Sequence, residues 1–161
     1  TYYYVVRATN ASGGSANSNQ ASALTWPAEI IIDNTSAQFS ASSNWVTASS
    51  ATDKYGADYR WRSAANGVHD PATFTWTAQQ TRQYEVYAWW PQGTNRCSST
   101  PFDISTQSGT VTVYRDQRTG GGQWQSLGTY TMNAGTNTVR VSVWTAASGV
   151  VMADAVRIVP R

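Results

Sequence analysis

Ten side chains of this 161-residue sequence could act as acids or bases near neutral pH: nine carboxylates and one imidazole. The carboxylates are Glu29, Asp33, Asp53, Asp58, Asp70, Glu85, Asp103, Asp116 and Asp154. Glycoside hydrolysis needs two carboxylates facing each other across a cleft, and a serine nucleophile needs a histidine base. His69 lies in the turn sequence Gly-Val-His-Asp-Pro, which predicts an exposed loop histidine, and no G-x-S-x-G motif is present. We therefore expect that the chain is not an enzyme.

Metal ligands are equally scarce. One histidine and one cysteine, Cys97, exclude a zinc site built from paired histidines or several thiolates. Asp33 at a strand end and Asp116 before a glycine turn are typical of side-chain to backbone turn bonds. Asp154 stands between two alanines in a strand pattern, so we expect a buried carboxylate with backbone or arginine partners. The one cofactor that the sequence leaves open is a structural calcium ion held by Asp side chains and loop carbonyls, although no D-x-D-x-D-G loop supports it.

Aromatic and arginine side chains are the better candidates for a binding function. Eight Trp and nine Tyr exceed what a domain of this size needs for packing, and soluble domains seldom leave aromatic patches in water without a use. Arginine suits carboxylates through its bidentate fork. The predicted ligand-binding residues are Tyr59, Arg60, Trp61, Arg62, Tyr87, Trp89, Arg96 and Trp144.

Each of these residues also has a packing interpretation. Strand alternation over residues 84–90 separates a predicted core set (Tyr84, Val86, Ala88, Trp90) from a predicted outer set (Glu85, Tyr87, Trp89). The opposite assignment stays open, because Trp90-Pro91 ends the strand. Trp45, Trp76 and Trp124 are expected in the core because their neighbours are apolar.

Composition excludes several classes of protein. Charged residues make up only 12% of the chain, and a net charge of +2 is too small for a surface that holds nucleic-acid phosphates. The longest apolar runs are only a few residues, too short to cross a membrane as helices. Low charge with many Thr, Ser, Gly and Trp residues is typical of an extracellular β-protein, so we expect a secreted chain.

The elements that must position these side chains are strands. Hydrophobic periodicity is close to two, and β-branched and aromatic runs alternate with Gly, Asn and Ser clusters. The predicted strands cover residues 1–9, 29–34, 72–77, 83–90, 109–117, 124–132, 137–145 and 150–159. The spacing predicts an all-β fold, an antiparallel, jelly-roll-like β-sandwich. Residues 43–66 are expected to be irregular, with room for a short helical turn.

Two glycine-containing turns predict a local arrangement. Gly120–Gly122 and Asn133-Ala134-Gly135 are typical of hairpin connections, so the strands within 109–145 are expected to form a three-stranded meander. In the last of them Val139, Val141 and Val143 should face the core, with Trp144 on the opposite side.

A domain boundary is predicted near Trp26-Pro27. The segment TYYYVVRATNASGGSANSNQASA resembles the last two strands of a fibronectin type III module, so residues 1–27 are predicted to be the C-terminal stub of such a linker. Its unpaired Tyr and Val side chains would favour a dimer of this fragment. Because the sequence opens within a strand, we expect it to be part of a longer protein.

Residues 28–161 carry a second resemblance. The blocks EIIIDN, KYGADY, FTWT, YEVYAWWPQGTNR, VTVYRDQ with GGQWQSLGTY, and VVMADAVRIV follow one another as in the golvesin/xanthan-lyase C-terminal domain family. This resemblance implies a carbohydrate-binding-like sandwich without catalytic residues, serving as an accessory module of a secreted polymer-degrading enzyme. It would dock that enzyme onto polysaccharide through exposed aromatic and Arg side chains. Alternatives are a spacer or adhesion module, or a binder of a hydrophobic polyester or peptidoglycan surface.

Overall fold

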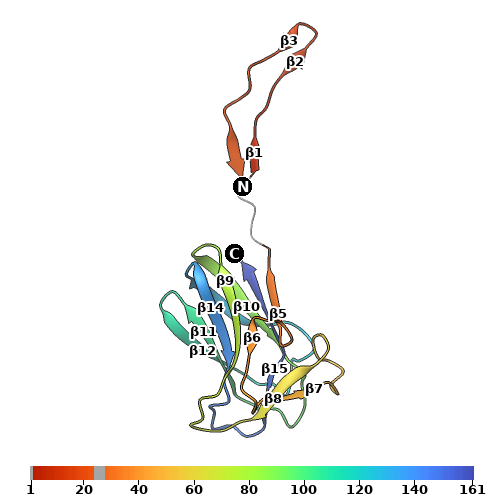
Figure 1. Cartoon of the computed structure of the whole chain (residues 1–161), viewed down its shortest axis with the longest axis vertical. Coiled ribbons are helices and arrows are strands. Elements are labelled where there is room, and N and C mark those ends of the chain that lie inside the picture. Colours follow the sequence, from red (N-terminus) through yellow and green to blue (C-terminus); the bar gives the residue numbers. More distant parts are fainter. Residues whose placement is uncertain (1, 24–27) are drawn as a thin grey trace.

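The computed structural model describes residues 2–23 and 28–161, and every regular element within these ranges is a β-strand (Figure 1). Each strand pair that it describes is antiparallel. The predicted antiparallel β-sandwich is therefore confirmed. No helix in these ranges is long and apolar enough to cross a membrane.

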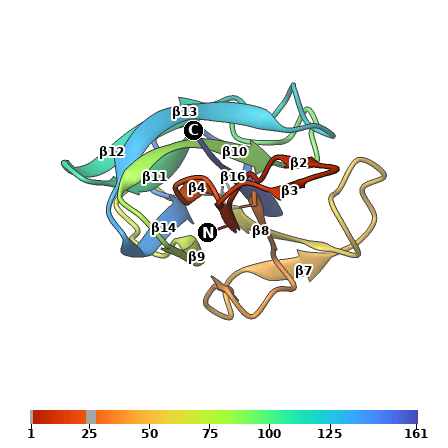
Figure 2. The same ribbon diagram turned by 90° about the horizontal axis from the view of Figure 1, so that it is seen from above.

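Two larger sheets and one smaller sheet make up the part after residue 28 (Figures 1 and 2). The first sheet contains, in spatial order, β13 (Gln125–Met132), β10 (Arg82–Trp89), β16 (Ala155–Pro160) and β5 (Ile30–Asp33). The second contains β12 (Gly109–Arg115), β11 (Thr100–Thr106), β14 (Gly135–Val141), β9 (Ala72–Ala78) and β6 (Phe39–Ser40). The third contains β15 (Val150–Ala153), β8 (Tyr59–Ser63) and β7 (Val46–Ala48).

The N-terminal segment forms a narrow hairpin of two short ladders. Strand β1 (Tyr2–Tyr4) pairs with β4 (Ala21–Ala23), and β2 (Thr9–Asn10) pairs with β3 (Gly13–Gly14). The predicted boundary at Trp26-Pro27 lies outside the described residues.

One apolar core lies between the two larger sheets, because alternate side chains of each sheet point inward. Tyr84, Val86 and Ala88 of β10 are buried, as is Trp90 just beyond it. The predicted core set of residues 84–90 is thus confirmed. The predicted inward valines Val139, Val141 and Val143 are buried too, together with Trp45 and Trp76.

The predicted meander over residues 109–145 is wrong. Strand β13 pairs with β10 in the first sheet, whereas β12 and β14 both pair with β11 in the second sheet. The chain therefore crosses from one sheet to the other at each of the two turns. The glycines of 120–122 serve a different purpose, since a Cβ at Gly121 would stand 2.5 Å from the carbonyl oxygen of Trp90. Glycine lets this loop pack tightly against the end of β10.

Three other expectations need correction. Residues 43–66 contain strands β7 and β8 and no helical turn. Strand β11 is absent from the predicted set because Pro101 interrupts its pattern, and proline cannot donate to a ladder. The Pro101 carbonyl still accepts a hydrogen bond from Ser142 N–H (2.9 Å), so the strand is kept. Trp124 is only half-buried and lies outside the core.

Core packing makes a direct stability prediction. Val139 and Val111 lie opposite Ile104 on its two sides, but Val139 is buried whereas Val111 is exposed on the edge strand β12. Val139→Ala should lower the free energy of unfolding by roughly 2 kcal/mol through lost burial and a cavity. Val111→Ala should change it by less than about 0.5 kcal/mol. Chemical denaturation of both variants measures the difference, and equal effects would contradict this core.

Candidate functional site

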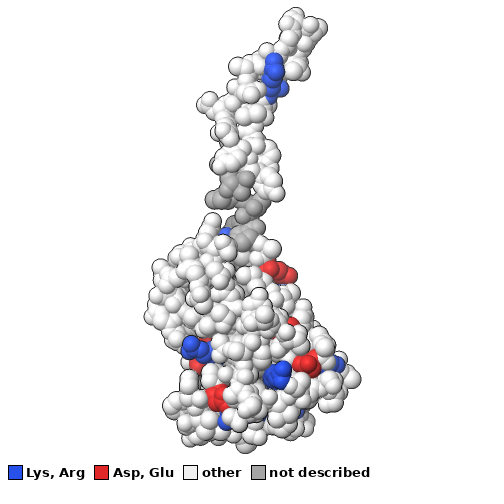
Figure 3. All heavy atoms as spheres, in the orientation of Figure 1, with Lys and Arg blue, Asp and Glu red and all other residues white. Residues whose placement is uncertain are grey.

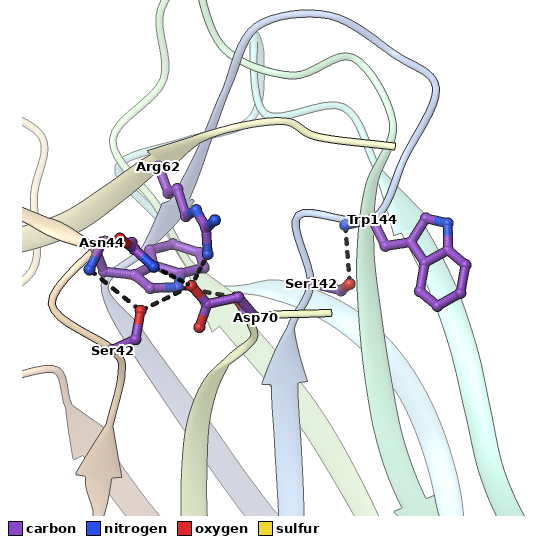
Figure 4. Close-up of polar contacts among 7 residues, drawn as sticks. Ser42, Asn44, Arg62, Asp70, Ser142 and Trp144 are labelled. Carbon is purple, nitrogen blue, oxygen red and sulfur yellow. Dashed lines mark hydrogen bonds and ion pairs between the residues drawn. The ribbon is translucent and has the colours of Figure 1, made fainter. Parts of the chain in front are cut away.

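The loop after β14, residues 142–149, holds an exposed tryptophan between buried residues. Ser142, Val143 and Thr145 are buried, whereas Trp144 is 53% exposed. Trp144 N–H donates to Ser142 Oγ (3.1 Å), and the Val143 carbonyl accepts from Ala65 N–H (2.9 Å). The indole therefore projects from a backbone that is fixed on both sides (Figure 4).

The far end of this loop is fixed by a close backbone approach. Gly149 has φ +112°, and a Cβ there would stand 2.7 Å from the carbonyl oxygen of Arg96. Val150 N–H donates to Asn95 O (3.0 Å), and Cys97 N–H donates to Val150 O (2.9 Å). Only glycine fits this crossing without strain, which anchors the loop that carries Trp144.

A polar network joins the neighbouring segments around Asp70. The carboxylate accepts from Ser42 Oγ (2.7 Å) and Asn44 Nδ2 (3.1 Å), and it forms an ion pair with Arg62. Trp45 Nε1 donates to the Asp70 carbonyl (3.0 Å). Figure 4 shows Arg62, Ser42 and Asn44 pointing toward Asp70, while the Trp144 indole points away from this network. Because both partners of the ion pair are only 18% exposed, the network chiefly fastens loops.

An aromatic cluster lies on the outer side of the first sheet. Trp89 of β10 contacts Trp124 and Tyr55, with ring centroids 5.4 and 5.5 Å apart, and Tyr55 lies 5.2 Å from Trp124. The Trp89 indole N–H donates to the Asp53 carbonyl (2.8 Å), which fixes its orientation. We call Tyr55, Trp89 and Trp124, with Tyr87 and Arg157 beside them, the sheet-face cluster.

Charged side chains border this cluster. The Arg157 guanidinium stacks on Tyr87 (4.5 Å to the ring centroid) and on Trp124 (5.3 Å). Its ion pair with Glu29 is loose, at 3.9 Å. Hydrogen bonds from Arg161 and Tyr87 hold the pKa of Glu85 below its usual range. The cluster thus combines aromatic rings with an arginine whose charge is only weakly neutralised.

The eight predicted site residues do not form one site but lie in several parts of the structure. Tyr87 and Trp89 lie together in the sheet-face cluster, and Trp144 projects from its own loop. Tyr59 is buried in the core, with its hydroxyl 3.3 Å from Ser50 Oγ, and Trp61 packs against the core as a half-buried residue.

The three predicted arginines all make contacts within the chain. Arg60 contacts the Thr47 hydroxyl, and Arg62 pairs with Asp70. Arg96 donates from Nε to the Pro91 carbonyl (3.2 Å) and from Nη1 to Asn95 Oδ1 (2.9 Å). Arg96 and Arg118 also line one shallow polar depression.

Sequence reasoning missed Tyr55, Trp124 and Arg157 as members of the sheet-face cluster. Arg157 could have been found, because it alternates with the buried residues Val156 and Ile158 and must therefore face outward. Tyr55 lies in a loop, so no periodicity in the sequence could place it beside Trp89.

The fold is an antiparallel β-sandwich, with aromatic rings at its surface in the sheet-face cluster and at Trp144. Residues 30–160 match the Golvesin C-terminal domain family, and the chain belongs to that family.

Two relatives are xanthan lyases. The chain is 40% identical over 134 residues to the xanthan lyase of Bacillus sp. (strain GL1), covering 81% of this chain and 14% of that protein. The solved Paenibacillus xanthan lyase superposes with a TM-score of 0.76 at 34% identity, covering 83% of this chain and 13% of that one. The chain therefore spans only a small part of either relative.

Isolated modules share the fold at lower identity. The CBM35 of Cellvibrio japonicus Abf62 matches with a TM-score of 0.61 at 18% identity, covering 82% of this chain and 93% of the module. Xyl-CBM35, solved with a disaccharide containing glucuronic acid, matches with a TM-score of 0.60 at 17% identity, covering 81% and 92%. These two likenesses establish a common architecture.

The network around Asp70 predicts that removing its carboxylate lowers the stability of the fold. Asp70→Ala should lower the free energy of unfolding by about 2 kcal/mol, because it leaves Arg62 and the donors of the 42–45 loop unpaired. The matched control is Asp116→Ala, since the Asp116–Arg118 pair is more exposed and its removal should change the free energy of unfolding far less. Urea denaturation compares them, and an Asp70 variant as stable as the control would contradict a structural role.

Proposed function

We propose that this chain is a non-catalytic carbohydrate-binding module that docks a secreted, polymer-degrading enzyme onto polysaccharide. The observation that carries this proposal is Trp144, an indole 53% exposed on a loop whose neighbouring residues are buried. Aromatic rings held rigidly in water suit the apolar face of a sugar ring. The family membership and the similarity to segments of two xanthan lyases support the same function.

The expected binding free energy can be estimated from the contact area between the sugar and the indole. A sugar ring covering about 80 Å² of the indole would contribute roughly 2 kcal/mol. A few such contacts, less the cost of association, give a dissociation constant on the order of micromolar to millimolar. Tethering to a catalytic domain would still raise the local concentration of substrate.

The surroundings of the ionisable groups favour binding over catalysis. Asp70 is engaged by three donors, and Glu85 and Asp116 each pair with an arginine. His69 is exposed in a loop. Figure 3 shows a face that is largely uncharged, with most of its Lys, Arg, Asp and Glu side chains in the lower half of the view.

The sheet-face cluster is a second candidate for the binding surface. Tyr55, Trp89 and Trp124 already pack against one another, so less ring surface is left for a ligand than at Trp144. Arg157 offers it a charge for an acidic sugar.

The N-terminal hairpin supports the alternative of a spacer or adhesion module. Tyr2, Tyr3, Tyr4, Val5 and Val6 are all exposed, and such a stripe can pair with a neighbouring domain or with a second copy of the chain. Sedimentation of the full chain at increasing concentration checks the predicted dimer, and a monomer throughout would contradict it.

Polymer retention tests the proposed function. The chain would be run through gels containing xanthan, cellulose, chitin, β-1,3-glucan, peptidoglycan or polyhydroxybutyrate, at low and high salt. We expect salt-resistant retention on one polysaccharide, and Trp144→Ala should weaken it about tenfold to thirtyfold, the equivalent of the lost stacking contact.

The matched control is Tyr114→Ala, which removes another exposed aromatic ring, 57% exposed, from the edge strand β12. It should leave retention unchanged, and both variants should keep the circular dichroism of the native chain. Retention lost in Trp89→Ala but kept in Trp144→Ala would overturn the assignment to Trp144. Retention on polyhydroxybutyrate or peptidoglycan alone would identify another ligand, and retention on none would favour the spacer.

A further inference from the structure

A shallow polar depression lies where the loops that follow β10, β12 and β14 meet, and we call it the arginine hollow. Its lining combines two guanidinium groups with uncharged polar side chains, and no described Asp or Glu side chain lines it. The side chains are those of Arg96, Arg118, Thr94, Asn95, Ser98 and Ser148. Every one of them can donate a hydrogen bond, so the hollow suits a ligand rich in acceptors.

Buried residues hold the two arginines in place. Gln117 N–H donates to the Cys97 carbonyl (3.0 Å), and both of these residues are fully buried. Arg96 and Arg118 directly adjoin this pair in the sequence, one on each side of the hollow. The two guanidinium groups therefore extend from backbone that cannot shift without opening the core.

The Arg96 side chain is oriented but its charge is not balanced. It is half-buried, and it donates from Nε to the Pro91 carbonyl (3.2 Å) and from Nη1 to Asn95 Oδ1 (2.9 Å). Both acceptors are uncharged, and Arg96 forms no ion pair with any described carboxylate. A partly desolvated guanidinium of this kind is stabilised most by an anion.

Arg118 is in a different situation. Its guanidinium donates from Nε to Asp116 Oδ1 (2.9 Å) and from Nη2 to Asp116 Oδ2 (2.6 Å), which balances its charge. The unbalanced positive charge of the hollow is therefore that of Arg96.

The hollow adjoins the loop that presents the exposed tryptophan. Ser148 and Gly149 line the hollow, and Trp144 lies four residues before Ser148 in the same loop. Even a fully extended chain would separate the Cα atoms of Trp144 and Ser148 by no more than about 14 Å. A short oligosaccharide stacked on the indole is therefore long enough to place a neighbouring substituent in the hollow.

We propose that the arginine hollow binds a carboxylate of an acidic polysaccharide, and that Arg96 selects this charge while Trp144 stacks on an adjoining sugar. The proposal rests on the proposed function and extends it from polysaccharides in general to those that carry carboxylates. The planar fork of a guanidinium matches a carboxylate, and the hydroxyl groups of the lining can donate to its remaining lone pairs.

Matched polymers test the selection of charge. The full chain would be run through gels containing xanthan or polygalacturonate, each beside a form whose carboxyl groups have been reduced to alcohols. We expect roughly fivefold stronger retention by one acidic polymer than by its reduced form at low salt. The difference should vanish in about 1 M NaCl, where charges are screened within about 3 Å.

Substitutions locate the site. Arg96→Gln should abolish the preference for the acidic form and keep the retention on the reduced form. The matched control is Arg140→Gln, which removes the same charge from the outer face of β14, opposite Asp103, and should keep the preference. A second comparison is Arg157→Gln, which tests the sheet-face cluster as the source of the selection.

A spectroscopic measurement replaces the variant if Arg96→Gln does not fold. Sodium galacturonate and galactose would be added separately to the unmodified, ¹⁵N-labelled chain. We expect the Arg96 Nε–H signal to move and saturate with galacturonate and to stay fixed with galactose.

The outcomes separate this proposal from the proposed function. Equal retention on acidic and reduced forms, or on neutral polymers alone, would overturn the arginine hollow and leave the docking function intact. A preference that persists in Arg96→Gln, or that is lost in Arg157→Gln instead, would place the selection elsewhere and overturn it too. Retention on no polymer would overturn both proposals.

Discussion

The packing of two sheet faces across one apolar core decides where every other feature of this chain can lie. Strand alternation gives each residue of β10 one of two environments, so burying Tyr84, Val86 and Ala88 necessarily turns Tyr87 and Trp89 outward. A buried glutamine also connects a loop to this core. Gln117 accepts from Met152 N–H and donates to the Met152 carbonyl, both at 2.8 Å, which ties the loop after β12 to β15.

Exposed aromatic rings owe their rigidity to the same core. Trp144 has buried neighbours on either side, so the backbone that carries its exposed indole cannot move without opening the interior. In the sheet-face cluster, the rings are fixed by one another and by the Asp53 carbonyl. A ligand meeting a pre-positioned ring loses less free energy to ordering than one meeting a mobile ring. Rigid presentation of aromatic surface is the property that links this fold to a docking function.

Local patterns predicted the strands and the core well, but they did not predict which strands pair. The alternation in β10 and the valines at 139, 141 and 143 identified inward faces, because burial follows directly from period two. Pairing of β13 with β10 depends on contacts distant in sequence, so two glycine turns were mistaken for hairpins. In the candidate site, too, local alternation predicts some residues, whereas others depend on contacts distant in sequence. Trp89 and Trp144 follow from alternation, whereas Tyr55 reaches Trp89 only through a loop.

The central claim is that Trp144 on its rigid loop contacts the sugar. Its most direct test is a ¹H–¹⁵N spectrum of the eight tryptophan indoles, recorded while an oligosaccharide cut from the retained polymer is added. We expect the Trp144 indole signal to move and saturate, while those of the buried Trp45 and Trp90 stay fixed. A saturable shift confined to Trp89 and Trp124, with Trp144 unmoved, would contradict the claim.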